Sequence, residues 1–139
     1  MQDHLIYEQS AVIPFRGEAD ILQVMLITNR SHKRWIIPKG LVEDHLTPCR
    51  SAELEALEEA GLKGTVYSNP IGQYRYAKWG GICEVTVFLM KVEDVLDEWL
   101  ESFRDRQWFN IQEAAEQVKE IGLKEMLRSL PRLLEQVRK

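Results

Sequence analysis

The sequence predicts an α/β fold in which helices pack on a mixed β-sheet. Apolar, β-branched runs at 5–14, 20–29 and 81–92 are typical of strands. Apolar residues at helical spacing occupy 122–138. Strands and helices do not alternate regularly along the chain, and this order favours a mixed sheet over a parallel one.

In the first part of the chain, the turn "RGEAD" at 16–20 separates the strands predicted at 5–14 and 20–29. The run "WII" at 35–37 predicts a further short strand, which Pro38 ends.

A helix is predicted over 47–60 because both of its ends carry capping signals. Thr47 can accept a hydrogen bond as the N-cap residue, and Pro48 suits the first helical position. Gly61 follows the last helical residue, where glycine is the usual terminator.

The second half begins with two strands, predicted at 64–77 and 81–92, with "KWGG" as a hairpin turn between them. The run "RQWFNI" at 106–111 predicts a short extended segment.

Two C-terminal helices are predicted at 112–118 and 122–138. Pro131 lies inside the second pattern and predicts a kink, or a break into two helices.

The 139 residues suit one domain, 1–139, and 45% hydrophobic residues are enough to build a core. The sequence contains no run of about 18 apolar residues that would predict a membrane span. The N-terminus lacks the basic start and apolar run of a signal peptide, so we expect a cytoplasmic protein. A net charge of −4 argues against stable nucleic-acid or membrane binding.

Positive charge is nevertheless concentrated in "NRSHKRWIIPKG", which holds Arg30, His32, Lys33, Arg34 and Lys39. Such a cluster beside an acidic helix suits a polyanion held through a metal ion. The alternative is a basic loop that is merely solvated.

The helix at 47–60 carries three carboxylates, those of Glu55, Glu58 and Glu59. At about 100° per residue they share an arc of roughly 100° between two apolar flanks. Crowded, partly buried carboxylates repel one another, and a divalent cation relieves that repulsion. Mg²⁺ and Mn²⁺ prefer such oxygen ligands, whereas the simpler alternative is an acidic surface helix.

At this point the sequence resembles the Nudix hydrolases. Their signature is Gly, five residues, Glu, seven residues, Arg-Glu, an aliphatic residue, any residue, Glu-Glu, any residue, Gly and an aliphatic residue. The matching positions here are Gly40, Glu55, Ala56, Glu58, Glu59, Gly61 and Leu62. The resemblance implies an α/β/α sandwich and metal-dependent hydrolysis of a phosphoanhydride bond.

Two further segments are similar to the diphosphoinositol polyphosphate phosphohydrolases, a subfamily that also handles dinucleoside polyphosphates. They are "EEAGLKGTV" and "WFNIQEA". The resemblance leaves the choice between these two substrate groups open.

The sequence departs from the signature at two positions. Leu46 stands where the family has its first Glu, and Leu54 stands where it has its Arg. In the family that Arg orients the helix through carboxylates, so both members of one ion pair have become leucine. Replacing both partners of a buried pair by apolar groups is often neutral, so we expect Leu46 and Leu54 to be in contact.

The resemblance also implies roles for the remaining residues. Glu55, Glu58 and Glu59 would hold Mg²⁺ or Mn²⁺ together with the Gly40 carbonyl, and Glu55 would accept the proton of the attacking water. Glu43 or Asp44 could stand in for the acid missing at position 46. Cationic side chains would bind substrate phosphates; the candidates are Arg34, Lys39, Arg75, Lys33 and Arg106, with His32 and Arg104 as weaker ones.

The expected partner is a small phosphorylated molecule, and the chain could be a monomer or a homodimer. The rival function is a Nudix-like module that binds a phosphorylated ligand with weakened or no catalysis. Retention of three crowded glutamates argues against that rival, because a site without a cation gains nothing from their repulsion.

Overall fold

A computed structural model describes residues 5–138. The strands are β1 (Ile6–Arg16), β2 (Gln23–Thr28), β3 (Trp35–Ile36), β4 (Lys39–Leu41), β5 (Leu62–Val66), β6 (Gly72–Lys78), β7 (Gly81–Val95) and β8 (Arg106–Asn110). The helices are α1 (Pro48–Ala60), α2 (Ile111–Gln117), α3 (Ile121–Arg128) and α4 (Leu130–Arg138), and a 3₁₀ turn, η1 (Ala19–Ile21), precedes β2.

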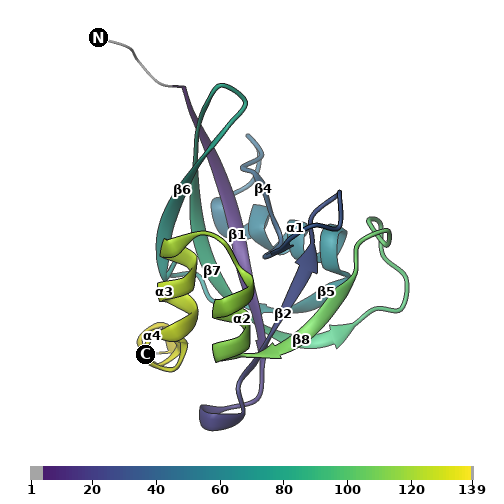
Figure 1. The fold of residues 1–139 in the computed structure, drawn as a ribbon, viewed down its shortest axis with the longest axis vertical. Coiled ribbons are helices and arrows are strands. Elements are labelled where there is room, and N and C mark those ends of the chain that lie inside the picture. Colours follow the sequence, from purple (N-terminus) through teal and green to yellow (C-terminus); the bar gives the residue numbers. More distant parts are fainter. Residues whose placement is uncertain (1–4, 139) are drawn as a thin grey trace.

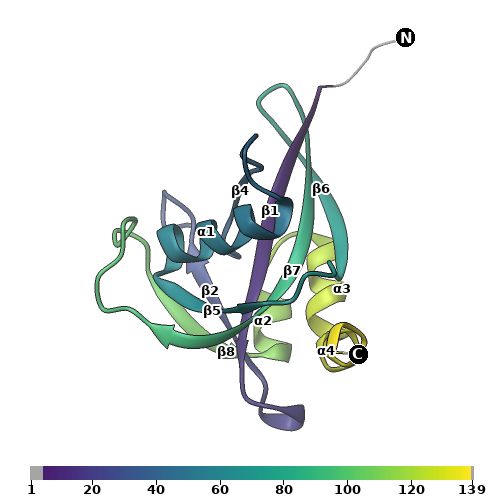
Figure 2. The same cartoon turned by 180° about the vertical axis from the view of Figure 1, so that it is seen from behind.

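The eight strands form one mixed sheet, as the sequence predicts. Its main path runs β3-β2-β1-β7-β5, with β4 paired to β1, β6 to β7 and β8 to β2. Only the β1–β7 pair is parallel among these pairings of the described residues. In Figures 1 and 2, which are opposite views, α1 covers one face of the sheet and α2, α3 and α4 cover the other. The expected α/β/α sandwich is therefore confirmed.

Alternate residues of β1 supply the two cores on either side of the sheet. Ala11 and Ile13 pack in the core beneath α2, α3 and α4. Val12 points the other way, where it packs with Ala52 and Ala56 of α1. The side-chain period of two in a strand thus lets the central strand face both layers.

The predicted ends of α1 are confirmed. The Thr47 hydroxyl accepts a hydrogen bond from the Arg50 N–H at 3.2 Å, and Pro48 occupies the first helical position. Gly61 ends the helix in the left-handed conformation at φ 66°, which glycine adopts without a Cβ penalty.

Two elements differ from the sequence prediction, and a third follows one of its alternatives. The single strand expected at 64–77 is two strands, β5 and β6, because Asn69-Pro70 lies in the non-strand segment between them. The helical pattern at 122–138 is broken into α3 and α4, which confirms the break that Pro131 predicts; Pro131 lies in the first turn of α4, where its missing N–H costs little. Strand β4 was not predicted, since "KGL" has no strand pattern and is extended by pairing with β1.

No helix within residues 5–138 is both long and apolar enough to cross a membrane.

Candidate active site

A cavity of about 1000 Å³ opens between β4, α1, the β6–β7 hairpin and the link between α2 and α3. Its lining includes Gly40, Glu55 and Glu59 on one wall. Tyr76 and Trp79 of the hairpin, together with Glu120, line other parts of it. Residues far apart in the sequence therefore meet at one end of the sheet.

Two of the three predicted glutamates enter this cavity. Burial, followed by the charges of Glu59 and Glu58, raises the pKa of the Glu55 carboxyl to about 8. Burial also raises the pKa of Glu59, against the lowering effects of the Lys39 N–H and the Arg104 charge. Glu58 is half-buried and does not line the cavity. The three carboxylates share the helix, but only Glu55 and Glu59 line the cavity.

Strand β4 lies directly against these two carboxylates. The Lys39 N–H donates a hydrogen bond to Glu59 Oε1 at 3.1 Å. A Cβ added to Gly40 would lie 2.2 Å from Glu55 Oε1. Gly40 is therefore required for the close approach of Glu55, in addition to its predicted role as a carbonyl ligand.

The donor chemistry fits a divalent cation. Glu55 and Glu59 present oxygen ligands from successive turns of α1, and they carry a mutual repulsion that a cation would remove. Within residues 5–138, no three His, Cys, Asp or Glu side chains lie close enough to hold a metal ion as they stand. The predicted third ligand, Glu58, thus needs a side-chain movement to join the pair.

Three of the five main phosphate-binding candidates line the cavity, namely Arg34, Lys39 and Arg75, and the weaker candidate Arg104 lines it as well. Each is already near a carboxylate or buried. Arg34 lies 3.5 Å from Glu120, and Arg75 Nε donates to Glu84 at 2.8 Å. Burial lowers the pKa of Lys39, although the charges of Glu120 and Glu59 oppose that effect.

The structure does not bring Lys33 or Arg106 to the cavity. Lys33 is exposed on the loop that precedes β3. The Arg106 guanidinium donates to the main-chain oxygens of Ala60 and Leu96, and its carbon lies 3.8 Å from the centre of the Trp99 ring. Both terminal nitrogens of Arg106 thus donate to main-chain oxygens outside the cavity. The position of Arg106 therefore does not support its predicted contact with a substrate phosphate.

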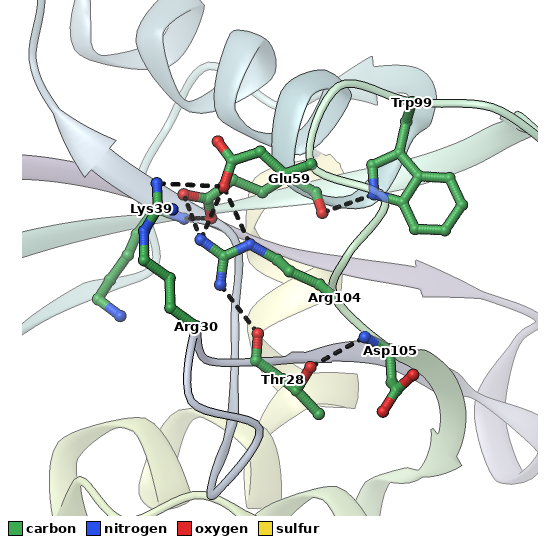
Figure 3. A network of polar contacts seen from close by, with 8 residues as sticks. Thr28, Arg30, Lys39, Glu59, Trp99, Arg104 and Asp105 are labelled. Atoms are coloured by element: carbon green, nitrogen blue, oxygen red, sulfur yellow. Dashed lines mark hydrogen bonds and ion pairs between the residues drawn. The ribbon is translucent and has the colours of Figure 1, made fainter.

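Sequence reasoning missed the segment between β7 and β8, which lies beside the Glu59 carboxylate (Figure 3). Trp99 Nε1 donates to the main-chain oxygen of Glu59 at 3.1 Å. Arg104, a weak phosphate candidate from the sequence, is 6% exposed and lies 3.6 Å from Glu59 Oε2. Glu101 binds the same arginine at 2.8 Å. No spacing rule links these residues to α1, because their contacts are set by the tertiary fold.

Leu46 and Leu54, the two departures from the signature, line one pocket of about 520 Å³ together with Leu57 and Leu62. Both are half-buried. The structure thus places an apolar groove at the position where the family has an ion pair, and direct contact between Leu46 and Leu54 stays a prediction.

The raised pKa of Glu55 predicts how the stability of the metal-free protein depends on pH. Its folded-state pKa of about 8 lies above its ordinary value of 4.5, so the folded state holds this proton more tightly than the unfolded state. The free energy of unfolding should therefore fall as pH rises from 4.5 to about 8. Urea denaturation in EDTA measures this fall, and Glu55→Gln should reduce it. A wild-type profile that is flat across this range would contradict the expectation.

Comparison with known proteins supports the resemblance. Residues 8–130 match the family described as NUDIX domain. "Nudix hydrolase 13, mitochondrial" of Arabidopsis thaliana is 32% identical over 120 residues, covering 78% of this chain and 58% of that protein. Diphosphoinositol polyphosphate phosphohydrolase 2 of Rattus norvegicus is 28% identical over 116 residues, covering 77% and 60%. The chain spans about three-fifths of the length of these curated relatives.

Solved structures support the fold. The structure of C. elegans Ap4A hydrolase superposes with a TM-score of 0.76 at 20% identity, covering 94% of this chain and 99% of that one. At that identity the likeness speaks for the fold alone. Because the family match extends over most of the chain, the protein belongs to the Nudix domain family.

Proposed function

We propose that the protein is a metal-dependent pyrophosphohydrolase, which cleaves a phosphoanhydride bond in a nucleoside or inositol diphosphate-type substrate. The observation that carries this proposal is the pair Glu55 and Glu59, which line a cavity that also contains Arg34, Lys39 and Arg75. Carboxylates for a cation and cations for phosphates therefore occupy one space.

Glu55, Glu59 and the Gly40 carbonyl would hold Mg²⁺ or Mn²⁺, whereas Glu58, also a ligand candidate from the sequence, lies outside the cavity and would act on the ion through its charge. Such an ion supplies charge neutralisation for phosphate oxygens and lowers the pKa of a bound water. Glu55 would accept the proton of the attacking water at its carboxylate. Arg34 and Lys39 would orient the phosphates, and their positive charge stabilises the negative charge that develops on the leaving phosphate.

Among possible substrates, we favour a dinucleoside polyphosphate or another nucleotide over a diphosphoinositol polyphosphate. Tyr76 and the half-exposed Trp79 give the cavity an aromatic wall on which a nucleobase can stack. Glu120 contributes a carboxylate that is 12% exposed and would oppose a densely phosphorylated ring. The curated relatives include diphosphoinositol polyphosphate phosphohydrolases, so both groups belong in the assay.

The test is phosphate or nucleotide release from a substrate panel in Mg²⁺, Mn²⁺ or EDTA. The panel holds dinucleoside polyphosphates, nucleoside diphosphate sugars and diphosphoinositol polyphosphates. We expect metal-dependent turnover that Glu55→Gln abolishes. No turnover on any compound would favour the rival binding module, and turnover that survives Glu55→Gln would reject the proposed site.

We also propose the cytoplasmic location that the sequence suggests. Three Arabidopsis relatives, in contrast, are named as mitochondrial.

A further inference from the structure

The segment 96–106, which links β7 to β8, holds the last turn of α1. The final carbonyls of a helix have no partner within the helix and must find one outside it. Here four successive residues, from Glu58 to Gly61, receive donors from this one segment. The bonds are Glu101 N–H to Glu58 O at 3.0 Å, Trp99 Nε1–H to Glu59 O at 3.1 Å, Arg106 Nη1–H to Ala60 O at 2.8 Å and Leu96 N–H to Gly61 O at 2.8 Å.

The same segment sends one arginine to the Glu59 carboxylate. The Arg104 side chain is 5% exposed and lies between Glu59, at 3.6 Å, and Glu101, at 2.8 Å. Its Nη1 donates to the Thr28 main-chain oxygen at 2.9 Å. Figure 3 shows the guanidinium between Glu59 and Thr28. With its donors used in this way, Arg104 is fixed and can orient a carboxylate.

The arginine of the signature cannot do this work here, because position 54 is Leu54. That side chain lines the apolar pocket beside Leu46, whereas Glu59 lines the cavity. Arginine therefore reaches the carboxylates of α1 from a different element, the segment 96–106.

We propose that Arg104 is a positioning residue that fixes the Glu59 carboxylate and takes over the orienting role that the family gives to position 54. The effect on turnover rests on the function proposed above, but the effect on Glu59 does not. Glu59 would be held on two sides, by Arg104 at Oε2 and by the Lys39 N–H at Oε1.

The Lys39 amide gives a direct report on Glu59. In the β1–β4 ladder the Val12 N–H donates to the Pro38 oxygen, and the Val42 N–H donates to the Glu8 oxygen. Because hydrogen-bonded and non-hydrogen-bonded pairs alternate in an antiparallel ladder, Lys39 belongs to a non-hydrogen-bonded pair. Its N–H consequently points away from β1, and it donates to Glu59. Exchange of this proton with solvent thus measures how well Glu59 is held, without metal or substrate.

The experiment is amide hydrogen exchange by NMR on the metal-free protein. In Arg104→Met we expect the Lys39 amide to exchange at least about tenfold faster, which corresponds to the loss of one hydrogen bond. The Val12 amide, in the same ladder, should be unchanged. Arg30→Met is the matched control, because Arg30 lies 3.8 Å from Glu101 and is not paired with Glu59. It should leave Lys39 exchange unaltered.

Kinetics give a second readout. Arg104→Met should lower kcat by about 10–100-fold, as for other partners that orient metal ligands, and leave KM within about threefold. Arg104→Lys should lie between wild type and Arg104→Met, since it keeps the charge without the planar fork.

If Arg104→Met does not fold, Arg104→Met/Glu101→Gln removes the uncompensated charge and serves in its place. Unchanged Lys39 exchange in either folded variant would overturn the proposal. If the wild type shows no turnover while Lys39 exchange rises as expected, the proposed function fails and the positioning role of Arg104 stands.

Discussion

Gly40→Ala is expected to reduce turnover by about 10²–10⁴-fold while changing the free energy of unfolding by no more than about 1 kcal/mol. The added Cβ would lie 2.2 Å from Glu55 Oε1 and 2.4 Å from its carboxyl carbon. The atoms that must move are the far end of a flexible side chain, so the fold can adjust. Glu55 cannot then keep its place, and the cation loses a ligand.

Steady-state kinetics and urea denaturation of Gly40→Ala check both halves of this expectation. Glu55→Gln is the matched variant, since it removes the ligand without changing the strand. The double variant Gly40→Ala/Glu55→Gln should be little worse than either single one, because both act on the same group. Full turnover in Gly40→Ala, or losses that multiply in the double variant, would show that Gly40 does not act through Glu55.

Glu59→Gln should cost about 10²–10⁴-fold in turnover, whereas Glu58→Gln should cost less than about tenfold. The signature treats the two glutamates alike, but only Glu59 lines the cavity. Glu58 is half-buried outside that lining, and it is the main-chain oxygen of Glu58 that binds the segment 96–106. A carboxylate outside the cavity would act on the ion only through its more distant, screened charge.

The two variants form a matched pair, with the same substitution on adjacent residues of one helix. Thermal unfolding with and without Mn²⁺ provides a readout apart from turnover. Mn²⁺ should raise the unfolding temperature of Glu58→Gln and leave that of Glu59→Gln nearly unchanged. Equal losses in the two variants would mean that Glu58 swings into the cavity and is a full ligand.

Local signals account for the parts of the molecule that the sequence predicts well. Thr47, Pro48 and Gly61 define α1 because capping depends on residues a few positions apart. The helical spacing places Glu55 and Glu59 on one side of α1, and both side chains line the cavity. The same arc includes Glu58, and only the packing of β4 against α1 distinguishes it.

The parts that could not be predicted depend on contacts with main-chain atoms or between distant elements. Arg106 looks like a phosphate ligand in the sequence, but it donates to the main-chain oxygens of Ala60 and Leu96. Every residue has a main-chain oxygen, so the sequence gives no sign of these contacts. Arg104 meets Glu59 only because β8 pairs with β2 and brings the preceding loop to α1. Strand β4 is extended because it pairs with β1, and not because of a strand pattern in its own residues.

The parallel pairing of β1 with β7 also determines when the site can form during synthesis. Ile6 pairs with Ile82 and Phe15 with Lys91, so the middle of the sheet joins segments some 76 residues apart. At about 5–20 residues per second, the ribosome needs roughly 4–15 s to make that intervening length. During this time the apolar β1 has no parallel partner, and the segment that carries Arg104 has not been made. Non-local pairing of this kind folds slowly and exposes strand edges, so a nascent chain of this protein should depend on chaperones until β7 emerges.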